Sequence, residues 1–228
     1  MLPYLLIFTV LRVRQEPNQY HKKIISRGIF AAIFPVLWLE SATTATQKTT
    51  NIMKIGLFYG STTCYTEMAA EKIRAIIGED LVDIFNVKDT PLSLMNDYDL
   101  LVLGISTWDF GEIQEDWSAV WEHIDGVSLK DKHVALFGLG DQEGYGEWFL
   151  DAMGLLHDEL KKTGAQFIGY WKNEGYEFEA SKGLVEGDDS QFVGLCIDED
   201  RQPELTDERV ENWVKQVYEE MCLAELEG

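Results

Sequence analysis

The segment KIGLFYGSTTCYTE, residues 54–67, changes from an apolar run into a run of hydroxyl-bearing side chains. A continuous apolar run that ends in glycine is typical of a strand buried on both faces, so we expect a strand over 54–60. A helix is expected to follow, because Thr66 is a candidate N-cap and apolar residues then recur three and four positions apart up to residue 77. Gly78 suits the position after its last turn. The order of strand, polar loop and helix predicts an α/β fold.

The rest of the chain repeats this alternation of apolar runs and helical patterns. Further strands are expected at 81–85, 99–105, 132–138, 167–171 and 191–197, and helices at 115–124, 147–163 and 206–223. Strands that alternate with helices across short loops predict a parallel sheet with helices on both faces, a doubly wound α/β domain. Ligands of such sheets bind beyond the carboxyl ends of the strands, so the loops that follow the strands are the places to look for a site.

The charge of the chain excludes several classes of partner. The sequence has 19 basic and 40 acidic residues, a net charge of −21, which opposes sequence-independent binding to nucleic acid and to anionic membranes. The same charge favours partners with basic docking faces. The three cysteines form no C-x-x-C pair and no cluster with the four histidines, so no metal site and no disulfide framework are expected. A sparse, odd set of cysteines indicates a reducing compartment, and we expect the protein in the cytoplasm.

Residues 1–52 differ in kind from the remainder. They carry six basic and two acidic residues, a charge of +4, which leaves −25 for residues 53–228. Two apolar runs of about 11 and 12 residues, 1–11 and 28–39, are shorter than the roughly 20 residues that cross a bilayer. We expect an atypical extension over 1–52 that arises from a wrongly assigned start, with Met53 as the true first residue. A signal peptide or anchor, and an extension of unknown role, are the alternatives.

The loop over 61–66 is a candidate anion site that has no cationic side chain. It supplies four Ser and Thr hydroxyls and the first free amides of a helix, which together can hold a phosphate. The alternative is an ordinary Ser/Thr-rich turn. No lysine stands where a P-loop needs one, and Gly60 alone cannot provide a dinucleotide fingerprint. Ala70 stands where a phosphatase with Cys64 as nucleophile would need an arginine. These absences favour a single terminal phosphate as the ligand.

Two later loops each present an aromatic residue on a polar, glycine-rich tip. Trp108 lies in STWDFGEIQEDW, residues 106–117, and Tyr145 lies in GLGDQEGYGEWF, residues 138–149. Two rings beside a phosphate site could enclose a planar heterocycle by stacking. Four other aromatic residues stand at helical spacing and are expected in the core: Trp117, Trp121, Trp148 and Phe149.

With these loops in view, residues 53–224 resemble a long-chain flavodoxin, close to the flavodoxin-B type of bacteria. The resemblance is carried, in order, by the hydroxyl loop 61–66, TWDFGE (107–112), GLGDQEGYGEWF, GYEFEASKGL (175–184) and FVGLCIDED (192–200). It implies a five-stranded parallel sheet in the order 2-1-3-4-5, with the last strand split by an insertion over 172–190. Flavodoxin is itself a standard example of a doubly wound sheet that binds FMN where the strand order reverses. The resemblance also implies FMN as the cofactor of a domain over 53–228.

The resemblance assigns residues to the FMN site. The cofactor-binding residues that it implies are Ser61, Thr62, Thr63, Cys64, Tyr65, Thr66, Thr107, Trp108, Asp109, Phe110, Gly111, Leu139, Gly140, Asp141 and Tyr145. The hydroxyl loop would hold the phosphate, and Trp108 and Tyr145 would flank the flavin ring. Two departures from the family pattern stand out. Cys64-Tyr65 replaces the usual Gly-Asn, and Ser106 replaces a proline, so FMN is expected to bind with altered affinity.

The function that the resemblance implies is a low-potential, one-electron carrier rather than an enzyme. Its expected partners are a flavodoxin/ferredoxin-NADP reductase and acceptor redox enzymes with basic docking faces, and the carrier is expected to be a monomer. Glu112, Glu115 and Asp116 are candidate docking charges, or else parts of a solvated helix face. Two alternatives remain: an FMN-dependent NAD(P)H:quinone reductase, and a binding module without flavin if Cys64-Tyr65 abolishes phosphate binding.

Overall fold

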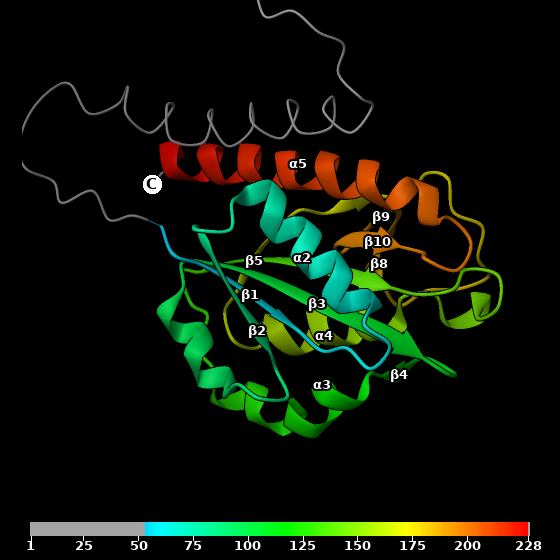
Figure 1. Cartoon of the computed structure of the whole chain (residues 1–228), viewed down its shortest axis with the longest axis horizontal. Helices are drawn as coiled ribbons and strands as arrows, with labels where there is room; N and C mark the ends of the chain where they lie inside the picture. The colour runs from blue at the N-terminus through cyan, green and yellow to red at the C-terminus, as the bar shows by residue number, and fades with distance from the viewer. Residues whose placement is uncertain (1–52, 228) are drawn as a thin grey trace, which may run out of the picture. The chain divides into compact units, whose positions relative to one another are not determined.

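The computed structural model of the protein describes residues 53–227 (Figure 1). The prediction of an extension over 1–52, whether wrongly assigned start, signal or anchor, therefore lies outside the described residues. Among the residues that are described, no helix combines the length and apolar character needed to cross a membrane. The same part of the chain contains no group of His, Cys, Asp and Glu side chains that could hold a metal ion.

A parallel sheet forms the centre of the domain. Its strands are β1 (Ile55–Tyr59), β2 (Val82–Asn86), β3 (Leu100–Trp108), β5 (His133–Leu139), β6 (Gln166–Ile168) and β10 (Leu195–Ile197). The order is β2-β1-β3-β5, and the last position is shared by two strands. β6 pairs with the first half of β5 and β10 with its second half, both in parallel. The predicted order and the split last strand are confirmed.

The insertion between β6 and β10 forms a small antiparallel sheet of its own. Its strands are β7 (Trp171–Lys172), β8 (Leu184–Val185) and β9 (Asp188–Phe192), in the order β7-β9-β8. Both strands predicted at its borders are interrupted. The strand expected over 167–171 breaks at Gly169, whose φ of 75° does not fit a strand. The strand expected over 191–197 divides between β9 and β10.

Helices cover both faces of the sheet, as Figure 1 shows. The helices are α2 (Tyr65–Ile77), α3 (Glu115–Val120), α4 (Asp151–Lys161) and α5 (Thr206–Glu227), with 3₁₀ turns η2 (Leu92–Asp97), η3 (Trp121–Gly126), η4 (Gly146–Trp148) and η5 (Pro203–Leu205). α2 packs beside α5 on one face, and α4 packs on β3 and β5 from the other. The helix predicted to begin at residue 147 begins only at Asp151, because Leu150 has a φ of 60°. The helix predicted over 115–124 continues beyond Val120 as η3.

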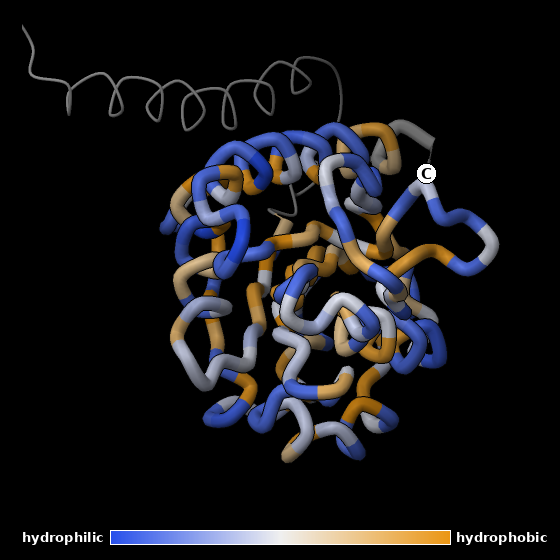
Figure 2. Tube along the Cα trace, turned by 90° about the vertical axis from the view of Figure 1, so that its right-hand side faces the viewer, coloured by the Kyte–Doolittle hydropathy of each residue, from blue (hydrophilic) through white to orange (hydrophobic). Residues whose placement is uncertain are grey.

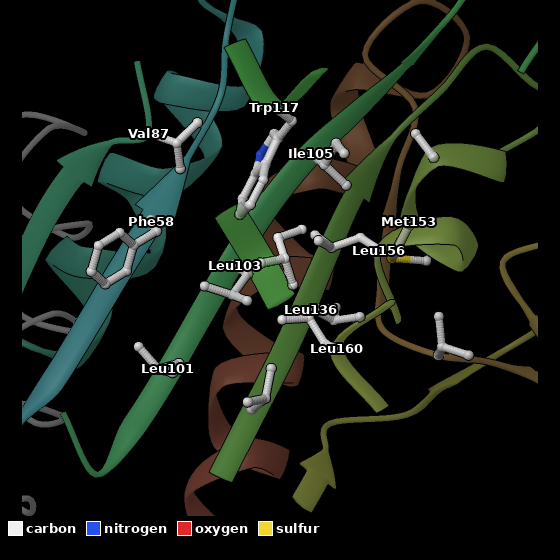
Figure 3. Packing of buried hydrophobic residues seen from close by; sticks show 14 of the residues in the cluster. Phe58, Val87, Leu101, Leu103, Ile105, Trp117, Leu136, Met153, Leu156 and Leu160 are labelled. Carbon is white, nitrogen blue, oxygen red and sulfur yellow. The ribbon is translucent and has the colours of Figure 1, made fainter. Parts of the chain in front are cut away.

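The core lies where alternate residues of the central strands meet the helices. Leu101, Leu103 and Ile105 of β3 are almost fully buried and lie on the same face as Met153 and Leu156 of α4 (Figure 3). Apolar residues concentrate in the central strands and polar residues on the outer helices (Figure 2). Burying one such Leu or Ile side chain contributes about 1.5–3 kcal/mol, so this layer fixes the strand ends on which the loops are built.

Candidate functional site

The loops that follow β1, β3 and β5 meet at one edge of the sheet and enclose a cleft of about 380 Å³. The strands are parallel, so their carboxyl ends share this edge. The cleft is lined by Thr63, Tyr65, Thr66, Ser106, Thr107, Trp108, Asp109, Leu139, Gly140, Asp141, Tyr145, Trp148, Phe149, Glu199 and Asp200. Most of the predicted binding residues are therefore brought together. No lysine or arginine is among these lining residues.

The remaining predicted residues lie beside the cleft wall. Ser61 and Cys64 belong to the same hydroxyl loop as Thr63, and Thr62 lines a neighbouring groove that it shares with Trp108 and Asp109. Phe110 and Gly111 form the turn that follows Trp108. The role of each of these residues in binding stays a prediction.

The hydroxyl loop leads directly into α2. The helix begins at Tyr65, with Cys64 as its N-cap residue and no capping hydrogen bond from the Cys64 side chain. The prediction of Thr66 as the N-cap is wrong, since Thr66 lies inside the first turn and is buried. Cys64 has a φ of 68°, so the position does require the left-handed conformation that glycine adopts without strain. The helix presents its first, unpaired N–H groups toward the loop.

A segment more than fifty residues further along the chain holds the hydroxyl loop in place through two hydrogen bonds. The Ser61 N–H donates to Asp116 Oδ2 at 3.1 Å, and Gln114 Nε2 donates to Thr62 Oγ1 at 3.0 Å. Asp116 was a candidate docking charge or else part of a solvated helix face, and both predictions are wrong because only 8% of it is exposed. Its carboxylate faces the loop rather than solvent. Glu112 and Glu115, the other two candidates, are exposed.

A hairpin carries the first aromatic of the cleft. Trp108, at the end of β3, pairs with Glu112 of the antiparallel strand β4 (Glu112–Ile113), and residues 109–111 form the turn. Asp109 has a φ of 41° and Gly111 a φ of 88°, which makes the reversal tight. A Cβ at Gly111 would meet Asp151 Oδ2 at 2.8 Å, so the turn lies directly on the start of α4. Phe110 projects from its tip and is 69% exposed.

Ser106 has a defined role at the position where the resemblance led us to expect a proline. Its Oγ accepts a hydrogen bond of 3.0 Å from Trp108 Nε1. The indole is thereby fixed from its own strand, two residues away. A proline could not provide this contact because its side chain has no acceptor.

The loop after β5 carries the second aromatic and a structured acidic group. Tyr145 is 43% exposed, and its N–H donates to the Asp141 carbonyl at 3.1 Å. Arg201 Nε lies 2.9 Å from Asp141 Oδ1. Partial burial alone would raise the pKa of Asp141, but the bonds from Arg201 and from the N–H groups of Gly144 and Glu143 outweigh it. The net result is a pKa below the usual range of an aspartate, so this carboxylate is ionised at neutral pH.

Five of the residues that line the cleft were not predicted from the sequence: Ser106, Trp148, Phe149, Glu199 and Asp200. Trp148 was expected in the core, but it is only partly buried. Its ring contacts the Phe110 ring edge-on, with 5.1 Å between the two ring centroids. Phe149 is in the core as expected and also reaches the cleft. Glu199 and Asp200 follow β10, so the rule that ligands lie beyond strand ends could have identified them. Of the other two expected core residues, Trp117 is fully buried and Trp121 packs against the core.

Comparisons with known proteins agree on one family. Residues 57–213 match the family model described as Flavodoxin. The chain is 60% identical to Flavodoxin 2 of Escherichia coli strain K12 over 170 residues, which make up 75% of this chain and 98% of that relative. It is 48% identical to Flavodoxin 1 of the same strain over 171 residues, 75% of this chain and 96% of that relative.

A solved structure gives the same result in three dimensions. Fusobacterium nucleatum flavodoxin bound to flavin mononucleotide is similar to this chain with a TM-score of 0.69. The sequence identity is 28%, and the similarity covers 74% of this chain and 98% of that chain.

Proposed function

The chain belongs to the flavodoxin family, and on that premise we propose that it is an electron-transfer protein that carries electrons on bound FMN. The expectation of a bacterial long-chain flavodoxin is thereby confirmed. The observation that carries the proposal is the cleft, whose lining combines a hydroxyl loop without cationic side chains and two aromatic residues on separate loops.

The residues present at the hydroxyl loop fit a terminal phosphate. Thr63 and Thr66 line the cleft, and the first turn of α2 adds unpaired N–H groups and the positive end of a helix dipole. These are uncharged donors that bind a phosphate through hydrogen bonds alone. Ser61 and Thr62 belong to the same loop but are not among the residues that line the cleft. The site volume of about 380 Å³ lies in the range of small cofactor pockets.

The other side of the cleft fits a planar ring system. Trp108 is fixed by Ser106, and Tyr145 is partly exposed on a second loop that lines the same cleft, so both could stack against a flavin. The backbone of Asp109 and Phe110 would face nitrogen N5 of the flavin ring. Gly140 and Asp141 would present backbone groups to the pyrimidine edge. These four contacts rest on the family resemblance together with the position of the two loops.

FMN supplies the redox chemistry when it is bound, since it takes up and releases electrons one at a time. The protein's own part is to bind the ring, exclude water from it and set its electrostatic environment. Asp109, Glu199 and Asp200 line the cleft, and Glu112 lies close by in the neighbouring groove. Acidic groups around the cleft oppose an added negative charge on a bound flavin, which favours a low reduction potential.

We propose that the rim of the cleft is also the docking surface. Phe110 and Tyr145 are exposed aromatic groups at the rim, and Glu112 and Glu115 are exposed acids beside them. A partner with basic residues around an apolar contact would complement this surface. The expected partners are a flavodoxin/ferredoxin-NADP reductase as electron donor and redox enzymes as acceptors. The three cysteines of the chain, all in its described part, are free, which fits a role in the cytoplasm.

The flavin content of the purified protein tests the proposal. The full-length chain is expressed and purified, its visible absorption spectrum is recorded, and the flavin released on denaturation is identified. We expect a yellow protein with one FMN per chain. A colourless protein that takes up no FMN when the cofactor is added would contradict the proposal and would favour a binding module without flavin.

A further inference from the structure

Two buried polar side chains hold the hydroxyl loop from a segment more than fifty residues away. Gln114 is fully buried and Asp116 is 8% exposed, and both lie at the junction of β4 and α3. Gln114 contacts Thr62, and Asp116 contacts the neighbouring residue, Ser61. Polar groups at this depth need well-formed partners, so the two contacts fix the position of the loop.

The orientation of the Gln114 amide is determined by its neighbours. Gln114 Oε1 accepts a hydrogen bond of 3.2 Å from the Trp117 N–H, so the amide NH₂ is the group that faces Thr62. The same oxygen packs closely on Gly60, where an added Cβ would lie 2.2 Å from it. Trp117 is held in turn, because its Nε1 donates to the Gly104 carbonyl at 2.8 Å.

This orientation decides what the Thr62 hydroxyl can do. Thr62 Oγ1 accepts a hydrogen bond from Gln114, and its own hydrogen can therefore be donated elsewhere. Because Thr62 lines the groove beside the cleft and not the cleft itself, the bond acts by holding the loop in place. Asp116 has the opposite electrostatic effect. It holds the Ser61 N–H, but it also places a buried negative charge beside the loop.

We propose that Gln114 and Asp116 are positioning residues that set the phosphate affinity of the hydroxyl loop in opposite directions. Gln114 strengthens binding of the phosphate because its bond to Thr62 holds the hydroxyl loop in the conformation that presents its donors. The charge of Asp116 weakens binding of a doubly charged phosphate, while its oxygen keeps Ser61 in place. This inference rests on the proposed function, because it takes the phosphate of FMN as the ligand.

The test compares FMN with riboflavin, which has the same ring and no phosphate. Full-length protein freed of flavin is titrated with each compound, and the ratio of the two dissociation constants reports the phosphate contribution alone. The variants are Gln114→Met and Asp116→Asn, which keep the side-chain size. Glu115→Gln is the matched control, since Glu115 is the exposed residue between them. A variant that merely loosens the fold would weaken both ligands and leave the ratio unchanged.

We expect Gln114→Met to weaken FMN binding about tenfold, the value of one hydrogen bond to a charged group, with riboflavin changed less than about twofold. In a Thr62→Val background the same substitution should no longer change the ratio, because the hydroxyl through which Gln114 holds the loop is gone. Asp116→Asn should tighten FMN binding about threefold and leave riboflavin unchanged. Glu115→Gln should leave the ratio near that of the unmodified chain.

Unchanged ratios in Gln114→Met and Asp116→Asn, with FMN bound normally by the unmodified chain, would overturn this inference and leave the proposed function standing. A Gln114→Met effect that persists in the Thr62→Val background would also overturn it. Failure of the unmodified chain to bind either flavin would instead overturn the proposed function.

Discussion

The two sides of the cleft are built in contrasting ways. At the phosphate side, the loop over 61–66 is uncharged and is held from behind by Gln114 and Asp116, which are buried. At the ring side, Trp108 and Tyr145 stand on loops whose tips are exposed and acidic. The difference suggests a division of tasks. We propose that the first side selects the cofactor by its phosphate, whereas the second sets the potential and meets the partner.

The largest expected effect comes from adding a methyl group at Gly60, which packs against Gln114 and Trp117 next to the hydroxyl loop. In Gly60→Ala, the new Cβ would lie 2.2 Å from Gln114 Oε1 and 2.7 Å from Trp117 Cδ1. We expect the free energy of unfolding to fall by about 1–3 kcal/mol, as is usual for an overpacked core, and FMN binding to weaken. Urea denaturation measures the first effect. Gly126→Ala is the control, because a Cβ there meets no atom within 4 Å. Equal stability of the two variants would show that the phosphate side is not rigid.

Removing an aromatic at the ring side should act on both flavins alike. In Trp108→Ala, stacking is lost, and we expect FMN and riboflavin each to bind more weakly by about 1 kcal/mol or more. Trp108→Phe, which retains a ring, should recover part of this loss. Fluorescence titration gives both dissociation constants. A change in the ratio of the two constants would contradict the division of tasks, since Trp108 would then contribute to phosphate binding.

A smaller, stabilising effect is expected within the hydroxyl loop. Cys64 has a φ of 68°, a conformation that costs a residue with a Cβ about 1–2 kcal/mol and glycine much less. Because glycine also loses more backbone entropy on folding, Cys64→Gly should raise the free energy of unfolding by only about 0.5–1 kcal/mol. Cys64→Ala keeps the Cβ and serves as the control, with no gain expected. Destabilisation by Cys64→Gly would show that the thiol has a role that the backbone conformation does not reveal.

The smallest effect concerns the ion pair at the ring side. The pKa of Asp141 is lowered in the folded protein, so its contribution to stability is present above the pKa of an unfolded aspartate, about 4, and is lost as the pH falls through the folded value. In Arg201→Gln, part of this loss should disappear from the pH dependence of unfolding between about pH 5 and pH 2. Lys215→Gln, which removes an exposed pair with Glu219, should leave the profile unchanged. Identical profiles for all three proteins would mean that the Asp141–Arg201 pair contributes nothing.

The strands and their loops could be predicted well from the sequence because both follow from local patterns. Continuous apolar runs predicted β1, β3 and β5, and the loops after them contain most of the cleft residues. Errors arose where a distant contact decides the outcome. The sequence around Asp116 indicates an exposed charge, but the fold brings the Ser61 N–H beside its carboxylate. The helical spacing of Trp148 indicates a core residue, but its ring contacts Phe110 at the cleft. Leu150 precedes α4 in a left-handed conformation that no sequence pattern indicates.

The central claim, that the chain carries electrons between partners and is not itself a reductase, is tested most directly by coupled NADPH oxidation. The purified, FMN-loaded protein is mixed with NADPH and a one-electron acceptor such as cytochrome c, with and without a flavodoxin/ferredoxin-NADP reductase. We predict acceptor reduction that the protein strongly accelerates in the presence of the reductase, that falls as ionic strength rises, and that is negligible when the reductase is left out. Rapid NADPH oxidation by the protein alone would contradict the account and identify the chain as an enzyme of the NAD(P)H:quinone reductase kind.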